Sequence, residues 1–376
     1  MYNRVHSFSR GRKSRRKIKM LRLLILIVAC LAVVALIAML AIYLIGSSKL
    51  ENQLVRLNAS STTQILSSDS NLYTLDGDVL VSTDYSGKDV WSVKLPSDNL
   101  SVAASNNLIC AYNKTTLQVL NTNKENLFAI TSENEIADVR CGLEHVSYLT
   151  TLTNEEGITS PHIIVFDQAG TKIDDVELQA ESVLDFGFTR DSDTLWVLTL
   201  DTSGVAPISR ISTYAPGQSI TGVIDINDTL VEKVYFDQDN IVASSTNQLY
   251  YYNYFNEELD SLTVYGLEPI DVVTSDGNIG FVYKLRQSND YLPTDSIRVV
   301  SNSLEEISIQ LPPEIAYIVT NNDKIYCFDS ETMYTYNING TLENTHTFEM
   351  PINNIQKLNS GHLLIQSNLD YYILPL

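Results

Sequence analysis

Residues 321–348 read NNDKIYCFDSETMYTYNINGTLENTHTF, and this stretch contains one copy of the unit that organises most of the chain. It opens with a polar turn, NNDK, and continues into KIYCF, where β-branched and aromatic residues dominate as they do in strands. A second polar turn, NINGTL near Ile338, follows another apolar stretch. Both turns are rich in the Asn, Asp and Gly residues that tight hairpins require. The stretch therefore predicts strands joined by short hairpins.

The same two kinds of turn recur along the chain at regular distances. Members of the first set lie about 37 to 49 residues apart, near Asn106, Leu143, Ser192, Gln238, Gly277, Asn322 and Ser360. Members of the second set lie about 20 to 25 residues after most of these, near Thr122, Gln168, Pro216, Asn256, Asn302 and Ile338, with one more near Ser86. A four-stranded unit that repeats every ~40 to 50 residues is the signature of a β-propeller blade.

We predict an all-β fold, a seven-bladed β-propeller over residues 64–376 preceded by one N-terminal transmembrane α-helix, with six or eight blades as the alternatives. Six blades lie complete between Leu100 and Pro351, and the last begins at Asn353 without an outer strand. The segment DVWSVKL near Trp91 can supply that strand and close the ring. The count is imperfect, because the three C-terminal strands together with DVLVSTD and DVWSVKL make five strands where four are needed.

The N-terminal region contains a long apolar run. Leu23 to Ile45 comprises 23 residues without a charge, which as a helix spans roughly 34 Å. A bilayer core of about 30 Å needs about 20 such residues. A secretory signal has a shorter apolar region and a cleavage site of small residues, whereas this run ends with bulky Tyr43, Leu44 and Ile45. The run predicts a permanent anchor, with acylation of Cys30 in a degenerate lipoprotein box as the weaker alternative.

The charges on either side of this run predict its orientation. Residues 1–46 carry nine Lys and Arg side chains and no acid, which keeps the N-terminus in the cytoplasm. We therefore expect a single-pass protein of the cell membrane with an extracytoplasmic C-terminal domain. Its predicted parts are a basic cytoplasmic tail (1–22), the transmembrane helix (23–45), a juxtamembrane stem (46–63) that can form a short helix through Lys49 to Leu57, and the propeller (64–376).

The exported part is strongly acidic. Residues 47–376 hold 16 Lys and Arg against 45 Asp and Glu, a formal charge of −29. Such a charge excludes nucleic acid as a partner, because nucleic-acid binding depends on cationic contacts with phosphate. Its three cysteines, Cys110, Cys141 and Cys327, are odd in number and have no metal-ligand spacing. They predict buried small apolar residues, with neither a disulfide framework nor a zinc site.

The stretch YSGKDVWSVKL resembles the Gly-Lys-x-x-Trp turn of quinoprotein-like propeller repeats, with Gly87, Lys88 and Trp91 in the matching positions. Together with the single anchor, the whole chain resembles an uncharacterised family, a domain of unknown function, of single-pass membrane-anchored propeller proteins from Gram-positive bacteria with quinoprotein-like or WD40-like repeats. The resemblance implies a seven- or eight-bladed extracytoplasmic propeller with no catalytic residues to carry over. Quinone-cofactor dehydrogenases have a Trp-bearing turn in nearly every blade, whereas this chain has only Trp91 and Trp196.

No local motif predicts catalysis, a cofactor or a metal. The exported histidines, His145, His162, His346 and His362, are scattered without ligand spacing, and nucleophile-elbow, phosphate-loop and zinc-helix motifs are absent. Asp191 with Asp193 and Asp237 with Asp239 have the spacing of calcium loops, but a complete loop supplies six to eight oxygens. We therefore assign no catalytic, cofactor-binding or metal-binding residue, although propeller active sites can combine residues from distant blades.

The segment QLYYYNYFNEE is rich in tyrosine. Strand alternation places Tyr250, Tyr252 and Tyr254 on one face and Tyr251 and Phe255 on the other. Packing in the core or between blades is the expected role of these side chains. The alternative is that one face is open and binds a ligand. The candidate ligand-stacking residues are then Tyr250, Tyr252 and Tyr254, because tyrosine stacks well on sugar or peptide.

These features together favour a binding protein. Our leading hypothesis is a membrane-anchored propeller that acts as a scaffold and binds an unidentified protein or cell-envelope polymer, contacting the membrane through residues 23–45. The alternative is a hydrolase or lyase that acts on cell-wall or extracellular carbohydrate through carboxylates in the propeller channel. Two or three carboxylates converging in a channel pocket would favour the enzyme, and a channel mouth of neutral polar residues would favour binding.

Overall fold

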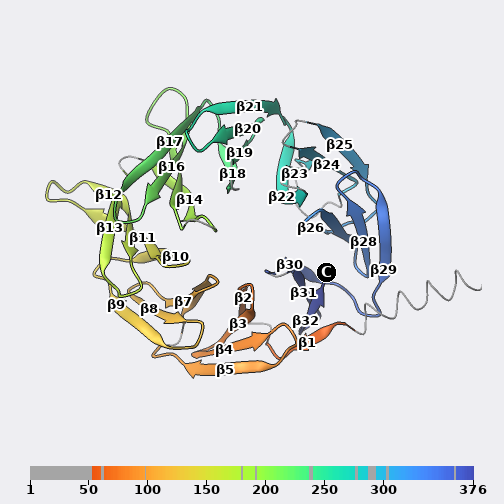
Figure 1. Cartoon of the computed structure of the whole chain (residues 1–376), viewed down its shortest axis with the longest axis horizontal. Coiled ribbons are helices and arrows are strands. Elements are labelled where there is room, and N and C mark those ends of the chain that lie inside the picture. The colour runs from red at the N-terminus through yellow and green to blue at the C-terminus, as the bar shows by residue number, and fades with distance from the viewer. Residues whose placement is uncertain are drawn as a thin grey trace, which may run out of the picture. The chain divides into compact units, whose positions relative to one another are not determined.

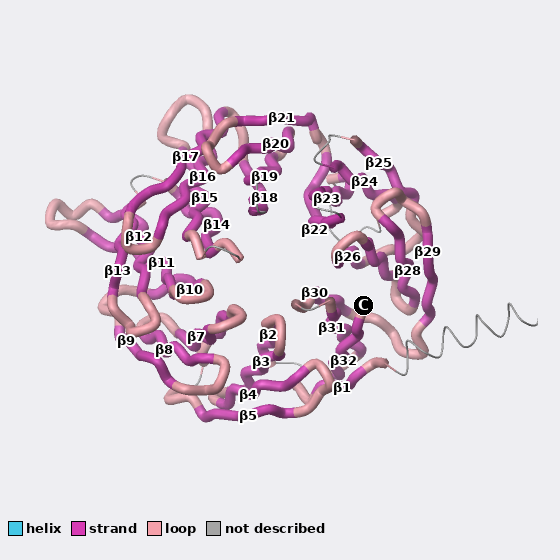
Figure 2. The backbone as a smooth tube through the Cα atoms, viewed as in Figure 1, coloured by secondary structure: helices cyan, strands magenta, loops and turns pink. Residues whose placement is uncertain are grey.

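The computed structural model describes residues 53–60, 63–97, 99–178, 181–190, 193–236, 240–275, 278–286, 294–301, 305–359 and 361–376. Residues 54–376 form one compact unit, and the regular elements assigned in its described part are all β-strands. Eight four-stranded antiparallel sheets are arranged radially around a central opening (Figures 1 and 2). The unit is therefore a β-propeller of eight blades.

Each blade runs from an inner strand beside the opening to an outer strand at the perimeter. The first four blades are β2 (Gln64–Ser67), β3 (Asn71–Asp76), β4 (Val79–Asp84) and β5 (Asp89–Lys94); β6 (Ser101–Ala104), β7 (Leu108–Tyr112), β8 (Thr116–Asn121) and β9 (Asn126–Thr131); β10 (Ile136–Cys141), β11 (Val146–Thr153), β12 (Thr159–Phe166) and β13 (Lys172–Glu177); and β14 (Ser182–Phe188), β15 (Leu195–Asp201), β16 (Ile208–Ala215) and β17 (Ser219–Asn227).

The last four blades follow the same order. They are β18 (Val231–Phe236), β19 (Asn240–Ser245), β20 (Gln248–Asn253) and β21 (Glu258–Thr263); β22 (Leu267–Ser275), β23 (Asn278–Leu285), β24 (Ser296–Ser301) and β25 (Glu306–Gln310); β26 (Tyr317–Asn321), β27 (Lys324–Phe328), β28 (Thr332–Asn337) and β29 (Leu342–Thr347); and β30 (Asn354–Lys357), β31 (His362–Ser367), β32 (Asp370–Pro375) and β1 (Val55–Leu57).

The prediction of seven blades is wrong, because blade 1 was not recognised as a complete blade. Its turn between β2 and β3, residues 68–70, contains neither Gly nor Asn. Instead the Ser68 hydroxyl accepts the N–H group of Asn71 at 3.1 Å, and the backbone N–H of Ser68 donates to the Asn71 carbonyl at 2.8 Å. This hairpin adds β2 and β3 to β4 and β5, which explains the surplus strands in the sequence count.

The ring is closed by β1, not by the segment around Trp91. Val55, Arg56 and Leu57 pair with Ile373, Tyr372 and Tyr371, so β1 is the outer strand of blade 8. The segment around Trp91 forms β5 and pairs with β4 inside blade 1. The predicted stem helix is also wrong at Val55–Leu57. These residues alternate between a half-buried, an exposed and a buried side chain, as a strand does, and pairing with β32 determines their conformation.

Among the residues that the structure describes, no helix has the length and apolar character needed to cross a membrane. The predicted transmembrane helix, residues 23–45, lies outside the described residues, as do the basic tail and the first part of the stem.

Five turns of the second set, which begin at Asp84, Asn121, Asp167, Asn253 and Asn337, share one hydrogen-bonding pattern. Asp84 accepts the N–H groups of Ser86 at 2.9 Å and of Lys88 at 3.0 Å, and Gly87 adopts φ +80°. Asn337 likewise accepts the N–H groups two and four residues further on, before a bulge in the β28–β29 register. Such a loop needs a side-chain acceptor at its start and a residue with positive φ three positions later. The predicted turns near Ser86 and Ile338 are therefore confirmed, and they join the third and fourth strands of blades 1 and 7.

Apolar clusters between neighbouring blades form the core. One face of each blade contributes to one cluster and the other face to the next, as with Tyr250 and Tyr252 against blade 4 and Tyr251 against blade 6. Full burial of such side chains stabilises the fold by roughly 1.5–3 kcal/mol each. Trp91 also joins blades 1 and 2, because its indole N–H donates to the Thr122 carbonyl at 2.9 Å.

Candidate functional site

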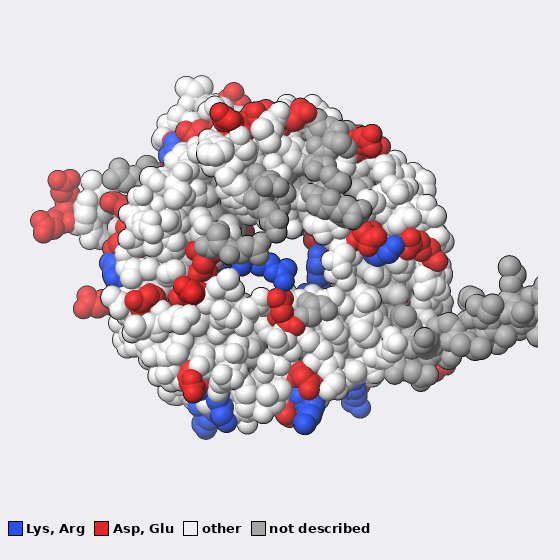
Figure 3. Space-filling model, viewed as in Figure 1, with Lys and Arg blue, Asp and Glu red and all other residues white. Residues whose placement is uncertain are grey.

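The turns between the first and second strands of blades 1, 2, 3, 4 and 8 converge at one end of the central channel. They enclose a cavity of about 210 Å³ that we call the channel mouth, lined by Asp69, Ala104, Ser105, Asn106, Cys141, Gly142, Leu143, Phe188, Thr189, Arg190 and Asn359. Figure 3 shows basic and acidic side chains gathered around the central opening. Residues separated by almost 300 positions therefore share one concave surface.

An ion pair links two nonadjacent blades at the channel mouth. Arg190, in the turn after β14, places Nη2 at 3.0 Å from Oδ2 and 3.2 Å from Oδ1 of Asp69, in the turn after β2. Asn106 donates from Nδ2 to the same Asp69 oxygen at 2.6 Å and accepts the Asp69 N–H at 2.9 Å. The Arg190 side chain remains about three-quarters exposed, so a ligand can reach it.

A buried carboxylate connects blades 3 and 4 beside the channel mouth. Asp193 adopts φ +51° and is 8% exposed. Its oxygens accept the backbone N–H groups of Leu143 and Glu144, and His145 Nδ1 lies 2.5 Å from Oδ2. The hydrogen bond to Asp193 raises the pKa of His145 above its usual value despite partial burial. We call these residues the Asp193 clamp, and it holds the two blades in register.

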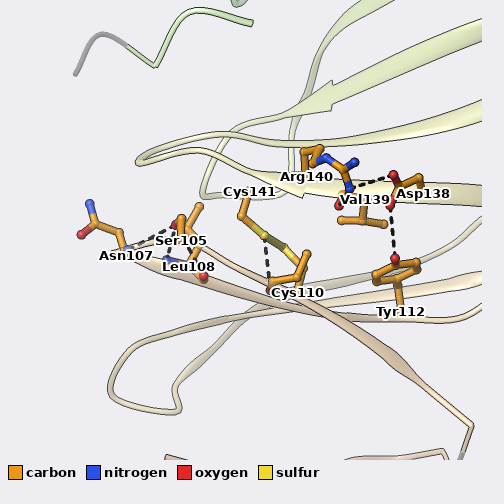
Figure 4. The surroundings of a disulfide bond; sticks show 10 residues. Ser105, Asn107, Leu108, Cys110, Tyr112, Asp138, Val139, Arg140 and Cys141 are labelled. Carbon is orange, nitrogen blue, oxygen red and sulfur yellow. Dashed lines mark hydrogen bonds and ion pairs between the residues drawn. A yellow bond between two sulfur atoms is a disulfide. The ribbon is translucent and has the colours of Figure 1, made fainter. Parts of the chain in front are cut away.

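A disulfide between Cys110 and Cys141 joins blades 2 and 3 at the wall of the channel mouth (Figure 4). Cys110 belongs to β7 and Cys141 ends β10, and these strands lie next to each other. The prediction that both residues are unpaired is therefore wrong. Their separation of 31 residues carries no motif, and only the stacking of blades brings them together. Cys327 is free and buried, as predicted, and burial raises the pKa of its thiol to about 12.

Three carboxylates of the inner strands β10, β14 and β22 contact a cation. Arg140 lies 2.7 Å from Asp138 and 3.4 Å from Asp185, while Lys357 lies 3.0 Å from Asp271. Thr320 also donates its hydroxyl to Asp271 at 2.8 Å. General acid–base catalysis needs a carboxyl group that can exchange its proton with substrate. Asp138 and Asp185 thus share the single guanidinium of Arg140, whereas Asp271 is paired with a lysine, and these contacts are suited to holding the blades together and to polar recognition.

The predicted ligand-stacking tyrosines do not gather on one open face. Tyr250 and Tyr252 are 9% and 5% exposed and pack in the core between blades 4 and 5. Tyr254 follows the end of β20 and is 42% exposed. The packing role expected from the sequence is confirmed for Tyr250 and Tyr252, while ligand stacking by the three residues stays a prediction.

The candidate metal residues are used differently or lie outside the described part of the chain. Asp193 belongs to the clamp, whereas Asp191, Asp237 and Asp239 lie outside the described residues. Within the described ranges, no three His, Cys, Asp or Glu side chains gather as a group that could hold a metal ion. The channel mouth itself was missed, because its residues come from turns that the sequence shows only as polar hairpins.

Comparison with solved structures places the fold in the class of WD40-like β-propellers. The WD40 domain of SCAP from fission yeast is 11% identical, covers 87% of this chain and 95% of its own, and superposes with a TM-score of 0.60. The C-terminal WD40 domain of Sif2 is 12% identical. The match covers 86% of this chain and 99% of the Sif2 domain, with a TM-score of 0.56. Dihydro-heme d1 dehydrogenase NirN is 10% identical. The match covers 85% of this chain and 74% of NirN, with a TM-score of 0.52. At such identities the likeness concerns the fold alone.

The chain belongs to the Family of unknown function (DUF5711), which matches residues 46–369. Comparison with curated proteins yields no match. Family membership, predicted from the repeats and the layout, is confirmed, and so is the WD40-like character of the propeller.

Proposed function

We propose that this protein is a membrane-anchored, extracytoplasmic scaffold that binds a protein or cell-envelope polymer at its channel mouth. The cavity formed by turns of five blades is the observation that carries the proposal. It combines an accessible ion pair, Arg190 with Asp69, with the amide side chains of Asn106 and Asn359 and the apolar side chains of Leu143 and Phe188. Concave sites with a few convergent polar groups are the usual places for ligands. WD40-like propellers typically bind other proteins.

Three observations support the proposed location. Residues 23–45 have the length and apolar character of a membrane span, and the nine cations before residue 46 favour a cytoplasmic N-terminus. The Cys110–Cys141 disulfide is typical of an oxidising compartment outside the cytoplasm. In this proposal residues 1–22 are cytoplasmic and the propeller lies outside, in the envelope of a Gram-positive bacterium as the sequence resemblance implies.

A hydrolase or lyase has less support. Such an enzyme needs two carboxyl groups that face one substrate with different protonation states. Asp69, Asp138, Asp185 and Asp271 are instead engaged by Arg190, Arg140 and Lys357, on different blades. These contacts favour the binding hypothesis.

Site-specific photo-cross-linking on intact membranes tests the proposal. A benzophenone amino acid replaces Asn106 or Asn359 in the full chain, and the control replaces Glu155, an exposed residue in the turn between β11 and β12. We expect the same adduct from both channel-mouth positions, and we expect the double change Asp69→Asn with Arg190→Gln to abolish it. An adduct of equal yield from Glu155, or none from the channel mouth, would contradict the proposal.

A further inference from the structure

The outer strand of blade 4 differs from the other outer strands. Free strand edges can pair with another chain, and proteins commonly prevent this with charged residues, prolines or short edges. β17, with the sequence SITGVIDIN, has nine residues and is the longest outer strand in the described part of the ring. Its single charged residue, Asp225, is engaged by Arg210 at 2.7 Å. Ile220 and Val223 are 50% and 41% exposed.

None of the remaining outer strands combines nine residues with two exposed large apolar side chains and a single charged residue. β13 carries four charged residues, β5 and β21 carry two each, and β25, β29 and β1 carry one each. β9 has no charged residue, but it has six residues and none of its large apolar side chains is exposed. The free edge of β17 is therefore exceptional within this propeller.

A groove lies beside this edge, between blades 3 and 4. Its wall in blade 4 is built from paired positions, because Tyr214 lies opposite Ile220 and Ser212 opposite Val223. The opposite wall contains Glu177 at the end of β13, Leu178 after it and Glu181 immediately before β14, and Arg210 of β16 also lines the groove. The cavity measures about 280 Å³, enough for one large side chain. Leu178, Tyr214, Ile220 and Val223 make its lining partly apolar.

The charges of the groove favour a cationic guest. Arg210 is bound by Glu181 and by Asp225, while the Glu177 carboxylate accepts a hydrogen bond from the neutral Ser160 hydroxyl. The groove and its rim thus carry three carboxylates, Glu177, Glu181 and Asp225, against the one guanidinium of Arg210, and residues 47–376 carry a formal charge of −29. A Lys or Arg side chain can place its apolar stem against Tyr214 and Val223 and its charge beside Glu177.

We propose that β17 binds an extended segment of a partner protein that alternates apolar and basic residues. The segment adds a fifth strand to blade 4, its backbone pairing with the free edge of β17 and its alternate side chains entering the groove. A second copy of this chain is the less suitable occupant, because two domains of charge −29 repel each other. This site is separate from the channel mouth, so the proposal does not depend on the function proposed above.

Peptide binding to the full chain in nanodiscs tests this proposal by fluorescence anisotropy. The probes are three labelled nonapeptides: alternating Val and Lys, the same peptide with its two central Val residues replaced by Pro, and alternating Val and Glu. We expect the Val/Lys peptide to bind, the Pro peptide to bind at least tenfold more weakly because it cannot complete the pairing, and the Val/Glu peptide not to bind. Two double variants change the exposed apolar pair on β17. One replaces Ile220 and Val223 by Lys (Ile220→Lys, Val223→Lys), the other replaces both by Thr (Ile220→Thr, Val223→Thr), and each should bind the Val/Lys peptide at least tenfold more weakly.

Leu342→Lys is the matched control, since Leu342 is 48% exposed on the outer strand β29; it should bind the Val/Lys peptide as the wild type does. Circular dichroism and melting temperature establish that each variant folds. Equal binding of the Val/Lys and Pro peptides would show electrostatic attraction alone and would overturn the proposal. An equal loss of peptide affinity in Leu342→Lys would overturn it too. A dimer that light scattering detects and that Val223→Lys dissociates would also overturn it, since β17 would then pair with the β17 of a second copy.

Discussion

Gly142 occupies a position where blades 3 and 4 approach too closely for a side chain. A Cβ atom there would lie 1.9 Å from Oδ1 of Asp193 and 2.8 Å from the ring of Phe188. Since the Asp193 carboxylate is fixed by three hydrogen-bond donors, it cannot move aside without breaking them. The sequence shows this residue only as the start of the polar turn GLE, and the partner that excludes a side chain lies about 50 residues further on.

We therefore expect Gly142→Ala to destabilise the propeller by about 1–3 kcal/mol, the usual cost of overpacking. Urea unfolding followed by tryptophan fluorescence measures it. The control is Gly204→Ala, whose new Cβ would meet no atom closer than 3.6 Å and should change the free energy of unfolding by less than about 0.5 kcal/mol. Equal stability of the two variants would show that the Asp193 clamp is not as rigid as its contacts indicate.

His145 makes the Asp193 clamp sensitive to pH. The hydrogen bond to Asp193 raises its pKa above the value of about 6.5 expected in the unfolded chain. A raised pKa in the folded state means that the contribution to stability is complete below about pH 6.5 and is lost as the pH rises through the folded value. We expect the difference in melting temperature between wild type and His145→Asn to be largest near pH 5.5 and to shrink above pH 8. A difference that grows with pH would contradict this assignment.

At the scale of strands and turns, the local chemistry of a hairpin decides how much can be predicted. Turns such as Asp84–Lys88 and Asn337–Thr341 contain an acceptor side chain and a glycine with positive φ, so the sequence alone indicates them. The turn after β2 closes through the Ser68 hydroxyl, and serine is too common elsewhere to mark a turn by itself. One unmarked hairpin of this kind changed the predicted number of blades from eight to seven.

The conformation of the short strand β1 cannot be predicted from its own three residues. Its three residues form a strand because β32 offers a free edge and because Leu57, 3% exposed, fills the apolar cluster between blades 8 and 1. The sequence VRL by itself is equally compatible with a short helix. The partner strand lies more than 300 residues away, and local propensity cannot report it.

Because β1 closes the ring, we expect a single substitution in this strand to lower the stability of the whole propeller. We expect Leu57→Ala to destabilise the propeller by about 2–4 kcal/mol, because it removes buried apolar volume at the seam. Arg56→Ala changes the neighbouring residue of the same strand, whose ion pair with Asp370 is exposed, and should have little effect. Chemical denaturation of the two variants provides the measurement. If both variants unfold like the wild type, β1 does not hold the ring closed.

At the scale of the whole molecule, compartment and disulfide are linked. The chain has four cysteines, and the structure pairs Cys110 with Cys141 and leaves Cys327 buried and free. If the propeller lies outside the cytoplasm, the disulfide forms in the cell. We expect two alkylated thiols per chain, Cys30 and Cys327, when protein from cells is denatured without a reductant and treated with a maleimide. After reduction four should react, and four before reduction would contradict both the pairing and the proposed location.

The sequence by itself determined the class of fold and the pattern of charge. The hairpin signals are local, since a turn depends on the residues within it, and a regular series of such turns is enough to predict a propeller. The long apolar run of residues 23–45 and the acidity of the remainder are likewise properties of composition that need no contact between distant residues.

Only the tertiary structure decided how the ring closes, how many blades it has and which side chains meet in the channel mouth. Asp69 with Arg190, Cys110 with Cys141, and β1 with β32 each join residues that are dozens to hundreds of positions apart. Their pairing follows from the radial stacking of blades, which places equivalent turns of different blades side by side. No local preference of the chain encodes which of many similar turns will be neighbours, so these contacts emerge only when the whole ring is formed.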